Sequence, residues 1–169
     1  MSSAASDHSI QVRLVGEDAW MSWRDIRLRA LQDSPNAFGS TYEREAVFTE
    51  SDFRERLRRD EPAVLAFADD MPVGMGAGYS DLDGWLHLVA MWVHPGWRQR
   101  RIGRRVLEVL LGWAHERGLR VHLDVVVGNA EARQLYEGLG FQGTGQTEPL
   151  RPGSPHRLER LVLPAHPPD

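Results

Sequence analysis

Arginines gather directly after the most apolar stretch of this chain. Trp85–Val93 is almost entirely apolar, which predicts a strand buried on both faces; His94-Pro95-Gly96 ends it, and Arg98–Arg104 then reads RQRRIGR. A helix should begin there, because apolar residues recur at three- and four-residue spacing at Ile102, Val106, Val109, Leu110 and Trp113. The first N–H groups of a helix lack partners within it, and its dipole favours negative charge. With several guanidinium groups added, this helix start predicts a site for a phosphate-rich ligand.

The strand, turn and helix that carry these arginines belong to a longer series of predicted elements. The predicted strands are Ile10–Leu14, Ala63–Ala68, Val73–Leu82, Trp85–Val93, Val121–Val127, Phe141–Thr147 and Arg157–Leu163. The helix between Trp85–Val93 and Val121–Val127 implies that these two strands pair in parallel through a right-handed crossover. Residues 9–164 are expected to form one domain, with a disordered segment over residues 1–8 and a frayed tail over residues 165–169.

Capping and turn residues set the expected ends of the other elements. Asp18 can cap a helix that runs to about Leu31, and a Thr49–Asp52 capping box opens a short helix that ends near Arg59. Between them, residues 33–48 read as a loop or a broken helix. Asn129 can cap a helix that ends at Gly140. Hairpin turns are predicted at Asp69-Asp70-Met71-Pro72 and at Asp83-Gly84.

Composition excludes several classes of function. The 169 residues include 20 basic side chains, all of them arginine, so neither a Walker-type phosphate loop nor a Schiff-base lysine is present. The sequence has no cysteine, which excludes disulfides, thiolate nucleophiles and zinc-thiolate sites and fits a cytoplasmic protein. A net charge of -4 disfavours a general nucleic-acid or anionic-membrane surface. The N-terminal residues do not resemble a signal peptide, and no apolar run reaches the roughly 18 residues of a membrane span.

Two motifs together resemble the Gcn5-related N-acetyltransferase (GNAT) family. The first is Arg98-Gln99-Arg100-Arg101-Ile102-Gly103 after Val93-His94-Pro95, similar to Gln/Arg-x-x-Gly-x-Gly/Ala after Val-x-Pro. The second runs from Asn129 to Phe141 and is similar to Asn-x-x-Ala-x-x-Leu/Phe-Tyr-x-x-x-Gly-Phe at every marked position. Arg101 replaces the first glycine of the first motif. An arginine is strained there if the position needs a positive φ, and is tolerable if the position only brings backbone close to phosphate.

The resemblance implies a fold and a co-substrate. The fold is α/β (α+β): a single-domain GNAT fold with a central mixed, mostly antiparallel sheet of about seven strands, flanked by about four helices, in which the parallel central strands splay apart. Acetyl-CoA would lie in that gap, without a metal ion. The implied binding residues are Met91, Trp92 and Val93 for the pantetheine arm, Arg98, Gln99, Arg100, Arg101, Ile102, Gly103 and Arg104 for the pyrophosphate, and Asn129 and Arg133 beside them.

The implied reaction is attack of a primary amine on the thioester, with Tyr136 protonating the departing thiolate. For the base that removes the amine proton, the family position indicates His87, whose imidazole titrates near neutral pH; His94 is a weaker candidate. Structural interpretations stand beside these roles. His87 could be a satisfied structural residue, Tyr136 could pack its ring against the sheet, and Asn129 could act only as a helix cap.

The acceptor is open at this stage: a small molecule or a peptide or protein N-terminus. Loops at Phe38–Glu45, Tyr79–Asp83 and Glu148–His156 are candidate acceptor segments, and their carboxylates, at Glu43, Glu45, Asp81 and Asp83, could attract a cationic amine. The alternative function is a degenerate CoA-binding sensor or interaction module without turnover. A nucleic-acid binder using Arg98–Arg105 is disfavoured by the net charge. A homodimer through the exposed strand Phe141–Thr147 is a further expectation.

Overall fold

A seven-stranded mixed sheet organises the chain, in the order β1-β2-β3-β4-β5-β7-β6. The computed structural model describes residues 9–58 and 60–165, so the predicted disorder of residues 1–8 and all but one residue of the predicted tail lie outside the described residues. The strands are β1 (Ile10–Leu14), β2 (Ala63–Ala68), β3 (Met71–Ser80), β4 (Trp85–Val93), β5 (Arg120–Val126), β6 (Gln142–Pro149) and β7 (Arg157–Leu163). Among the described strands only β4 and β5 pair in parallel, which confirms a mixed, mostly antiparallel sheet.

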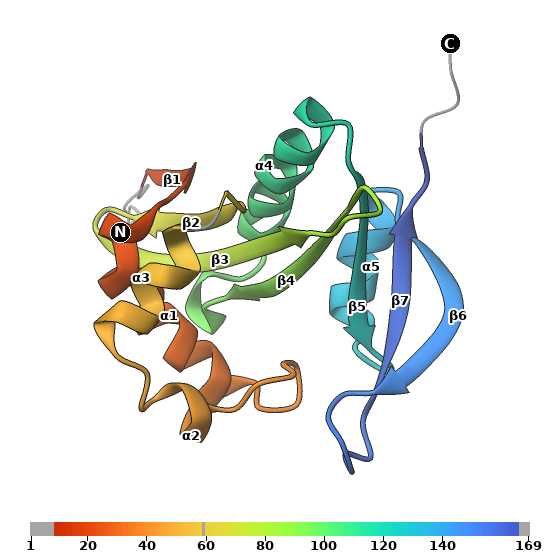
Figure 1. The fold of residues 1–169 in the computed structure, drawn as a ribbon, viewed down its shortest axis with the longest axis horizontal. Coiled ribbons are helices and arrows are strands. Elements are labelled where there is room, and N and C mark those ends of the chain that lie inside the picture. The colour runs from red at the N-terminus through yellow and green to blue at the C-terminus, as the bar shows by residue number, and fades with distance from the viewer. Residues whose placement is uncertain (1–8, 59, 166–169) are drawn as a thin grey trace, which may run out of the picture.

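Helices cover both faces of this sheet (Figure 1). They are α1 (Trp20–Asp33), α2 (Tyr42–Glu45), α3 (Glu50–Arg58), α4 (Ile102–Glu116) and α5 (Ala130–Gly138), with single 3-10 turns η1 (Glu17–Ala19) and η2 (Pro95–Trp97). Strand β2 shows how the two layers form: Val64, Ala66 and Ala68 join the core under α4, whereas Leu65 and Phe67 join the core under α1 and α3. The described helices include none with the length and apolarity that a membrane span requires.

Two of the three predicted helix caps are correct. The Thr49–Asp52 capping box forms in both directions, with N···O distances of 2.8 and 3.2 Å, and the Asn129 side chain accepts from the Ala132 N–H at 3.2 Å. The predicted Asp18 cap is wrong, because η1 precedes α1 and places Ala19 at the cap position without a side-chain hydrogen bond. The segment predicted as a loop or broken helix contains the single turn α2, capped by Thr41.

Two expectations for the central strands need correction. The turn between β2 and β3 is only Asp69-Asp70, with Asp69 at φ +52°, so Met71 and Pro72 already belong to β3. Strand β4 is not buried on both faces. Leu86, Leu88 and Trp92 are buried while the residues between them are half-buried, because one face of β4 borders the cavities described below.

Strands β4 and β5 separate halfway along their length. They pair from Trp85–Leu88 against Arg120–Leu123, and no pairing continues beyond Leu88 although both strands run on. At the same point Ala90 adopts φ +59° and the register of β4 against β3 shifts. This bulge bends β4 away from β5, and Figure 1 shows the two strands diverging. The predicted splay of the parallel central strands is therefore present.

Candidate active site

A cavity of about 400 Å³ lies where β4 ends and α4 and α5 begin. We call it the helix-start cavity. Most residues predicted for the co-substrate site line it: Met91, Trp92, Val93, Arg98, Gln99, Arg101, Ile102, Gly103, Arg104 and Asn129. Tyr136 lines it as well, from the second turn of α5. Most of the residues predicted for co-substrate binding therefore lie on one continuous surface. It is formed by the end of β4 and the starts of α4 and α5, at the gap between β4 and β5.

The turn before α4 presents unpaired backbone donors to this cavity. Gln99 and Arg101 adopt φ +64° and +60°, a left-handed conformation that costs a non-glycine residue about 1–2 kcal/mol. Arg101 therefore does occupy a position where glycine is favoured. Its side chain makes no capping hydrogen bond, and the first N–H bonded into α4 is that of Arg105. Within the described part of the chain the N–H groups of Ile102, Gly103 and Arg104 have no backbone acceptor, so they can bind a ligand, and their helix start favours an anion.

The arginines of this turn differ in how they are held. Arg98 donates from Nε to the Val93 carbonyl at 3.0 Å and from Nη2 to Asp33 Oδ2 at 3.2 Å, which fastens the turn to β4 and α1. Arg100 lies over the Trp97 ring at 4.8 Å and Arg133 pairs with Glu137 and Glu159; neither lines the helix-start cavity. Among the arginines predicted to hold the pyrophosphate, the structure brings three to the cavity wall: Arg98, Arg101 and Arg104.

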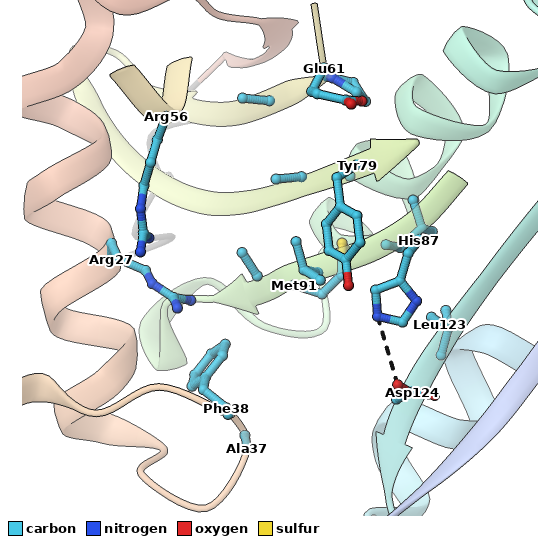
Figure 2. A pocket seen from close by; sticks show the side chains of 18 of the residues that line it. Arg27, Ala37, Phe38, Arg56, Glu61, Tyr79, His87, Met91, Leu123 and Asp124 are labelled. Atoms are coloured by element: carbon cyan, nitrogen blue, oxygen red, sulfur yellow. Dashed lines mark ion pairs between the residues drawn. The ribbon is translucent and has the colours of Figure 1, made fainter. Parts of the chain in front are cut away.

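A second cavity, of about 560 Å³, opens between the splayed strands on the side covered by α1 and α3. We call it the sheet-gap cavity. Figure 2 shows Tyr79, His87 and Asp124 on one side of it and the guanidinium groups of Arg27 and Arg56 on the other. Ala37, Met91 and Tyr136 line both cavities. The two spaces therefore meet at Met91 and Tyr136.

His87 lies at the strand side of the sheet-gap cavity in a chain of polar contacts. Its Nδ1 is 2.8 Å from Nδ1 of His122, and its Nε2 is 3.7 Å from Oδ2 of Asp124 (Figure 2). Asp124 in turn accepts two hydrogen bonds from Arg160, at 2.9 and 3.1 Å. Sequence reasoning missed the last three residues, although the parallel pairing it predicted places His122 directly beside His87.

Burial favours the neutral form of the two histidines of this cluster. It lowers the pKa of His87 from 6.5 to about 4; the charge of Asp124 opposes this, while those of His122 and Arg160 add to it. The pKa of His122 is lowered for the same main reason. Asp124 favours the protonated form of His87, but burial outweighs that effect, and Arg160, which pairs with Asp124, opposes it as well. His87 is therefore a neutral imidazole at neutral pH, and the expectation that it titrates near neutral pH is wrong because its ring is buried.

Tyr136 separates the two cavities as a protonated phenol. Its side chain is 7% exposed and packs edge-on against Phe141 at a centroid distance of 6.0 Å. Burial raises the pKa of Tyr136 to about 12. At neutral pH the hydroxyl therefore keeps its proton and can donate it.

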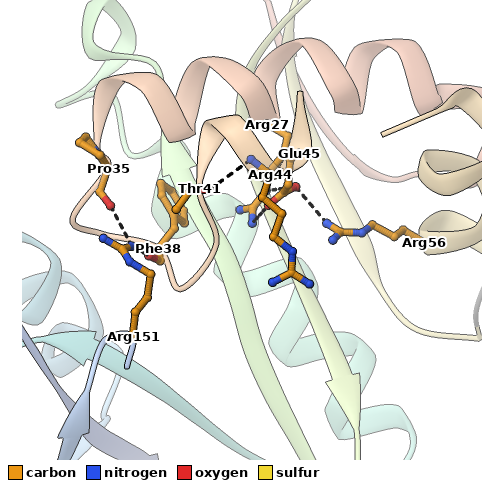
Figure 3. A network of polar contacts seen from close by, with 8 residues as sticks. All are labelled: Arg27, Pro35, Phe38, Thr41, Arg44, Glu45, Arg56 and Arg151. Atoms are coloured by element: carbon orange, nitrogen blue, oxygen red, sulfur yellow. Dashed lines mark hydrogen bonds and ion pairs between the residues drawn. The ribbon is translucent and has the colours of Figure 1, made fainter. Parts of the chain in front are cut away.

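A buried ion-pair network forms the helix side of the sheet-gap cavity. Arg27 donates from Nε and Nη2 to the two oxygens of Glu45, at 3.0 and 2.9 Å, and Arg56 Nη1 donates to Glu45 Oε1 at 3.1 Å (Figure 3). Burial alone would raise the pKa of Glu45, yet the hydrogen bonds and charge of Arg27 outweigh it and lower that pKa. The expectation that Glu45 could attract a cationic amine from a loop is therefore wrong, because its carboxylate is buried against two arginines.

Comparison with known proteins identifies the family. The model of the acetyltransferase (GNAT) family matches residues 20–141. No protein of curated function matches the chain. Similar solved structures include a GNAT-family acetyltransferase from Streptococcus pneumoniae, with 16% identity, coverage of 92% of this chain and 100% of that chain, and a TM-score of 0.77.

Two other solved structures share the fold. A ribosomal-protein-alanine N-acetyltransferase from Brucella melitensis is 20% identical, with coverage of 90% of this chain and 98% of that chain and a TM-score of 0.67. A protein from Salmonella typhimurium, described with its cofactor acetyl-CoA, is 18% identical, with coverage of 95% and 98% and a TM-score of 0.69. The family match spans both motifs and both splayed strands. This chain belongs to the GNAT acetyltransferase family.

Proposed function

We propose that this protein is an acetyl-CoA-dependent N-acetyltransferase that acetylates a primary amine of a small molecule or a peptide N-terminus. The observation that carries the proposal is the meeting of two cavities at Met91 and Tyr136. One cavity offers an anion site at a helix start, and the other offers a neutral imidazole beside a carboxylate. A donor and an acceptor bound in the two spaces would approach each other at a protonated phenol.

The residues of the helix-start cavity fit acetyl-CoA, which supplies an acetyl group as an activated thioester. The N–H groups of Ile102, Gly103 and Arg104, with the arginine side chains at the wall, would hold the pyrophosphate. The edge of β4 beyond Leu88 has no strand partner on the β5 side, so its backbone groups can bond the pantetheine amides. Description of the Salmonella typhimurium neighbour with acetyl-CoA supports this choice of co-substrate.

His87 is proposed to remove the proton of the attacking amine. In the tautomer competent for this, Nδ1 carries the ring proton and donates to His122, which leaves the lone pair of Nε2 free. The 3.7 Å between Nε2 and Asp124 is too long for a hydrogen bond, so the carboxylate does not accept from Nε2 and does not impose the tautomer with its proton there. Once Nε2 is protonated, the same carboxylate stabilises the imidazolium.

Tyr136 is proposed to supply the second proton. Its hydroxyl belongs to a side chain that borders both cavities, and burial keeps it protonated at neutral pH. A phenol in that position can donate to a leaving group on the co-substrate side while the amine arrives from the other side. His87 and Tyr136 would thus act on opposite sides of the transferred group.

Acetyl-CoA binding followed by turnover tests the proposal. A thermal-shift titration with acetyl-CoA should raise the melting temperature, because ligand that binds only the folded state stabilises it. Thiol release over a panel of amines in the same samples should then identify an acceptor class. A rise in melting temperature without thiol release for any amine would favour the CoA-binding sensor. An unchanged melting temperature would refute the proposed acetyl-CoA site. Homodimerisation and a cytoplasmic location stay predictions.

A further inference from the structure

The helix side of the sheet-gap cavity holds hydrogen-bond donors that nothing in the described part of the chain satisfies. Arg27 Nη1 and Trp23 Nε1 are both buried and have no partner among the described residues. Arg27 and Trp23 are only 8% and 4% exposed, and both line the cavity. A buried donor without a partner is costly, so two of them on side chains that line one cavity indicate a ligand that accepts hydrogen bonds there.

The charge on this side of the cavity is also uncompensated. Arg27 and Arg56 share the single carboxylate of Glu45. Burial lowers the pKa of Arg56, and the charges of Arg27 and Arg44 lower it further, whereas Glu45 opposes them. Two guanidinium groups therefore share one carboxylate on this side, because the other carboxylates of the lining are engaged elsewhere: Glu61 accepts from Ser80, and Asp124 accepts from Arg160. A second carboxylate would balance the charge and accept from the free donors.

The walls between the two sides are apolar and held in place. Phe38, Leu57 and Leu150 line the cavity, and Arg27 lies over the Phe38 ring at 5.1 Å. Arg151 holds the loop between α1 and α2 in place by donating to the Phe38 carbonyl at 2.7 Å and to the Pro35 carbonyl at 3.2 Å (Figure 3). A cavity of about 560 Å³ with such walls has the size and lining of a small-molecule site.

We propose that the acceptor is a small amino carboxylate with an apolar body. Its carboxylate accepts from Arg27 Nη1 and Trp23 Nε1 near the charge of Arg56, and its amine lies on the opposite side, towards His87 (Figure 2). This rests on the proposed function. In the reaction the amine nitrogen bonds to the acetyl carbonyl carbon, the C–S bond breaks, His87 takes the amine proton and Tyr136 gives one to the sulfur. The products are the N-acetyl amino carboxylate and the CoA thiol.

Matched acceptors test the carboxylate without any mutation. Thiol release from acetyl-CoA is measured with phenylalanine, phenylalaninamide and phenethylamine, with leucine, leucinamide and 3-methylbutylamine, and with 6-aminohexanoate and hexylamine. The kcat/KM should be at least about tenfold higher for an amino carboxylate than for its neutral partners, the loss expected when a charged acceptor is removed from buried donors. Equal or higher rates with the neutral amines would overturn the proposal.

A binding measurement separates this inference from the proposed function. If no amine releases thiol, the proposed function fails, and the melting temperature with CoA is compared in the presence of N-acetylphenylalanine and of its carboxamide. Stabilisation by the carboxylate alone would still support carboxylate recognition in the sheet-gap cavity. Equal shifts, or none, would overturn it.

Two conservative variants locate the carboxylate site. Trp23→Phe deletes the Nε1 donor and keeps an aromatic ring, and Arg56→Gln removes a charge while the Arg27–Glu45 pair remains. Each should raise KM for the preferred amino carboxylate about tenfold and leave KM for acetyl-CoA unchanged. The control is Arg54→Gln, on the same helix as Arg56 and paired with Glu50 outside the cavity lining. Unchanged KM values in both variants, or an equal effect on neutral amines, would refute the assignment.

Discussion

Replacement of His87 should flatten the acid dependence of stability. Burial lowers the folded-state pKa of His87 from 6.5 to about 4, so the unfolded chain binds a proton that the folded chain excludes. Above pH 6.5 His87 is neutral in both states and does not reduce the free energy of unfolding. As the pH falls from 6.5 towards 4, the unfolded chain takes up the proton first, and the free energy of unfolding decreases. At pH 4.5 the loss attributable to His87 is about 2 to 3 kcal/mol.

The assay is urea unfolding at pH 7.0 and pH 4.5 for the wild type and for His87→Asn. The variant should lose about 2 to 3 kcal/mol less than the wild type between the two pH values, whatever its stability at pH 7.0. His115→Asn, at an exposed histidine of α4, is the control and should behave as the wild type. Equal pH dependence in wild type and His87→Asn would show that His87 is not held neutral, and the argument from burial would fail.

Three further substitutions test the local energetics by urea unfolding. Arg101→Gly should be more stable than Arg101→Ala by about 1 kcal/mol, because only glycine relaxes the left-handed turn, and equal stabilities would contradict that strain. Arg27→Met should lower the free energy of unfolding by about 3–5 kcal/mol, because it leaves the buried Glu45 with one weaker partner. Adding Glu45→Met should recover part of this loss. A double variant no more stable than the single one would refute the charge argument. Gly76→Ala should cost about 1–3 kcal/mol, since its Cβ would lie 2.6 Å from Met91 Sδ and 2.7 Å from Val106 Cγ1. A neutral Gly76→Ala would show that this packing beside the bulge yields easily.

Local sequence patterns predicted the strands, the central helix and the helix-start cavity. Arg157–Leu163 is a strand with the predicted bounds, and the helix after the arginine segment begins at Ile102 as its apolar spacing indicates. These features depend on residues close together in the chain, where periodicity and capping act directly. The side-chain roles at this cavity remain predictions, because contact with the co-substrate is what defines them.

The polar contacts of the sheet-gap cavity could not be predicted in the same way. Asp124 meets Arg160 across 36 residues, and Arg27 meets Glu45 across 18 residues. Such pairs depend on strand order and on how α2 docks against α1, which no local pattern encodes. The predicted parallel pairing of the central strands is the one signal from which the contact between His87 and His122 could have been found.

The central claim is transfer of an acetyl group across the junction at Tyr136, and the most direct test uses acetyl-CoA carrying a 13C-labelled acetyl group. Mass spectrometry should detect the label on the amine nitrogen of the acceptor, in equal amount to the thiol released. Tyr136→Phe should lower kcat about 100-fold with an unchanged KM for acetyl-CoA. Bound acetyl-CoA without labelled product for any amine, or an unaltered kcat in Tyr136→Phe, would contradict the account.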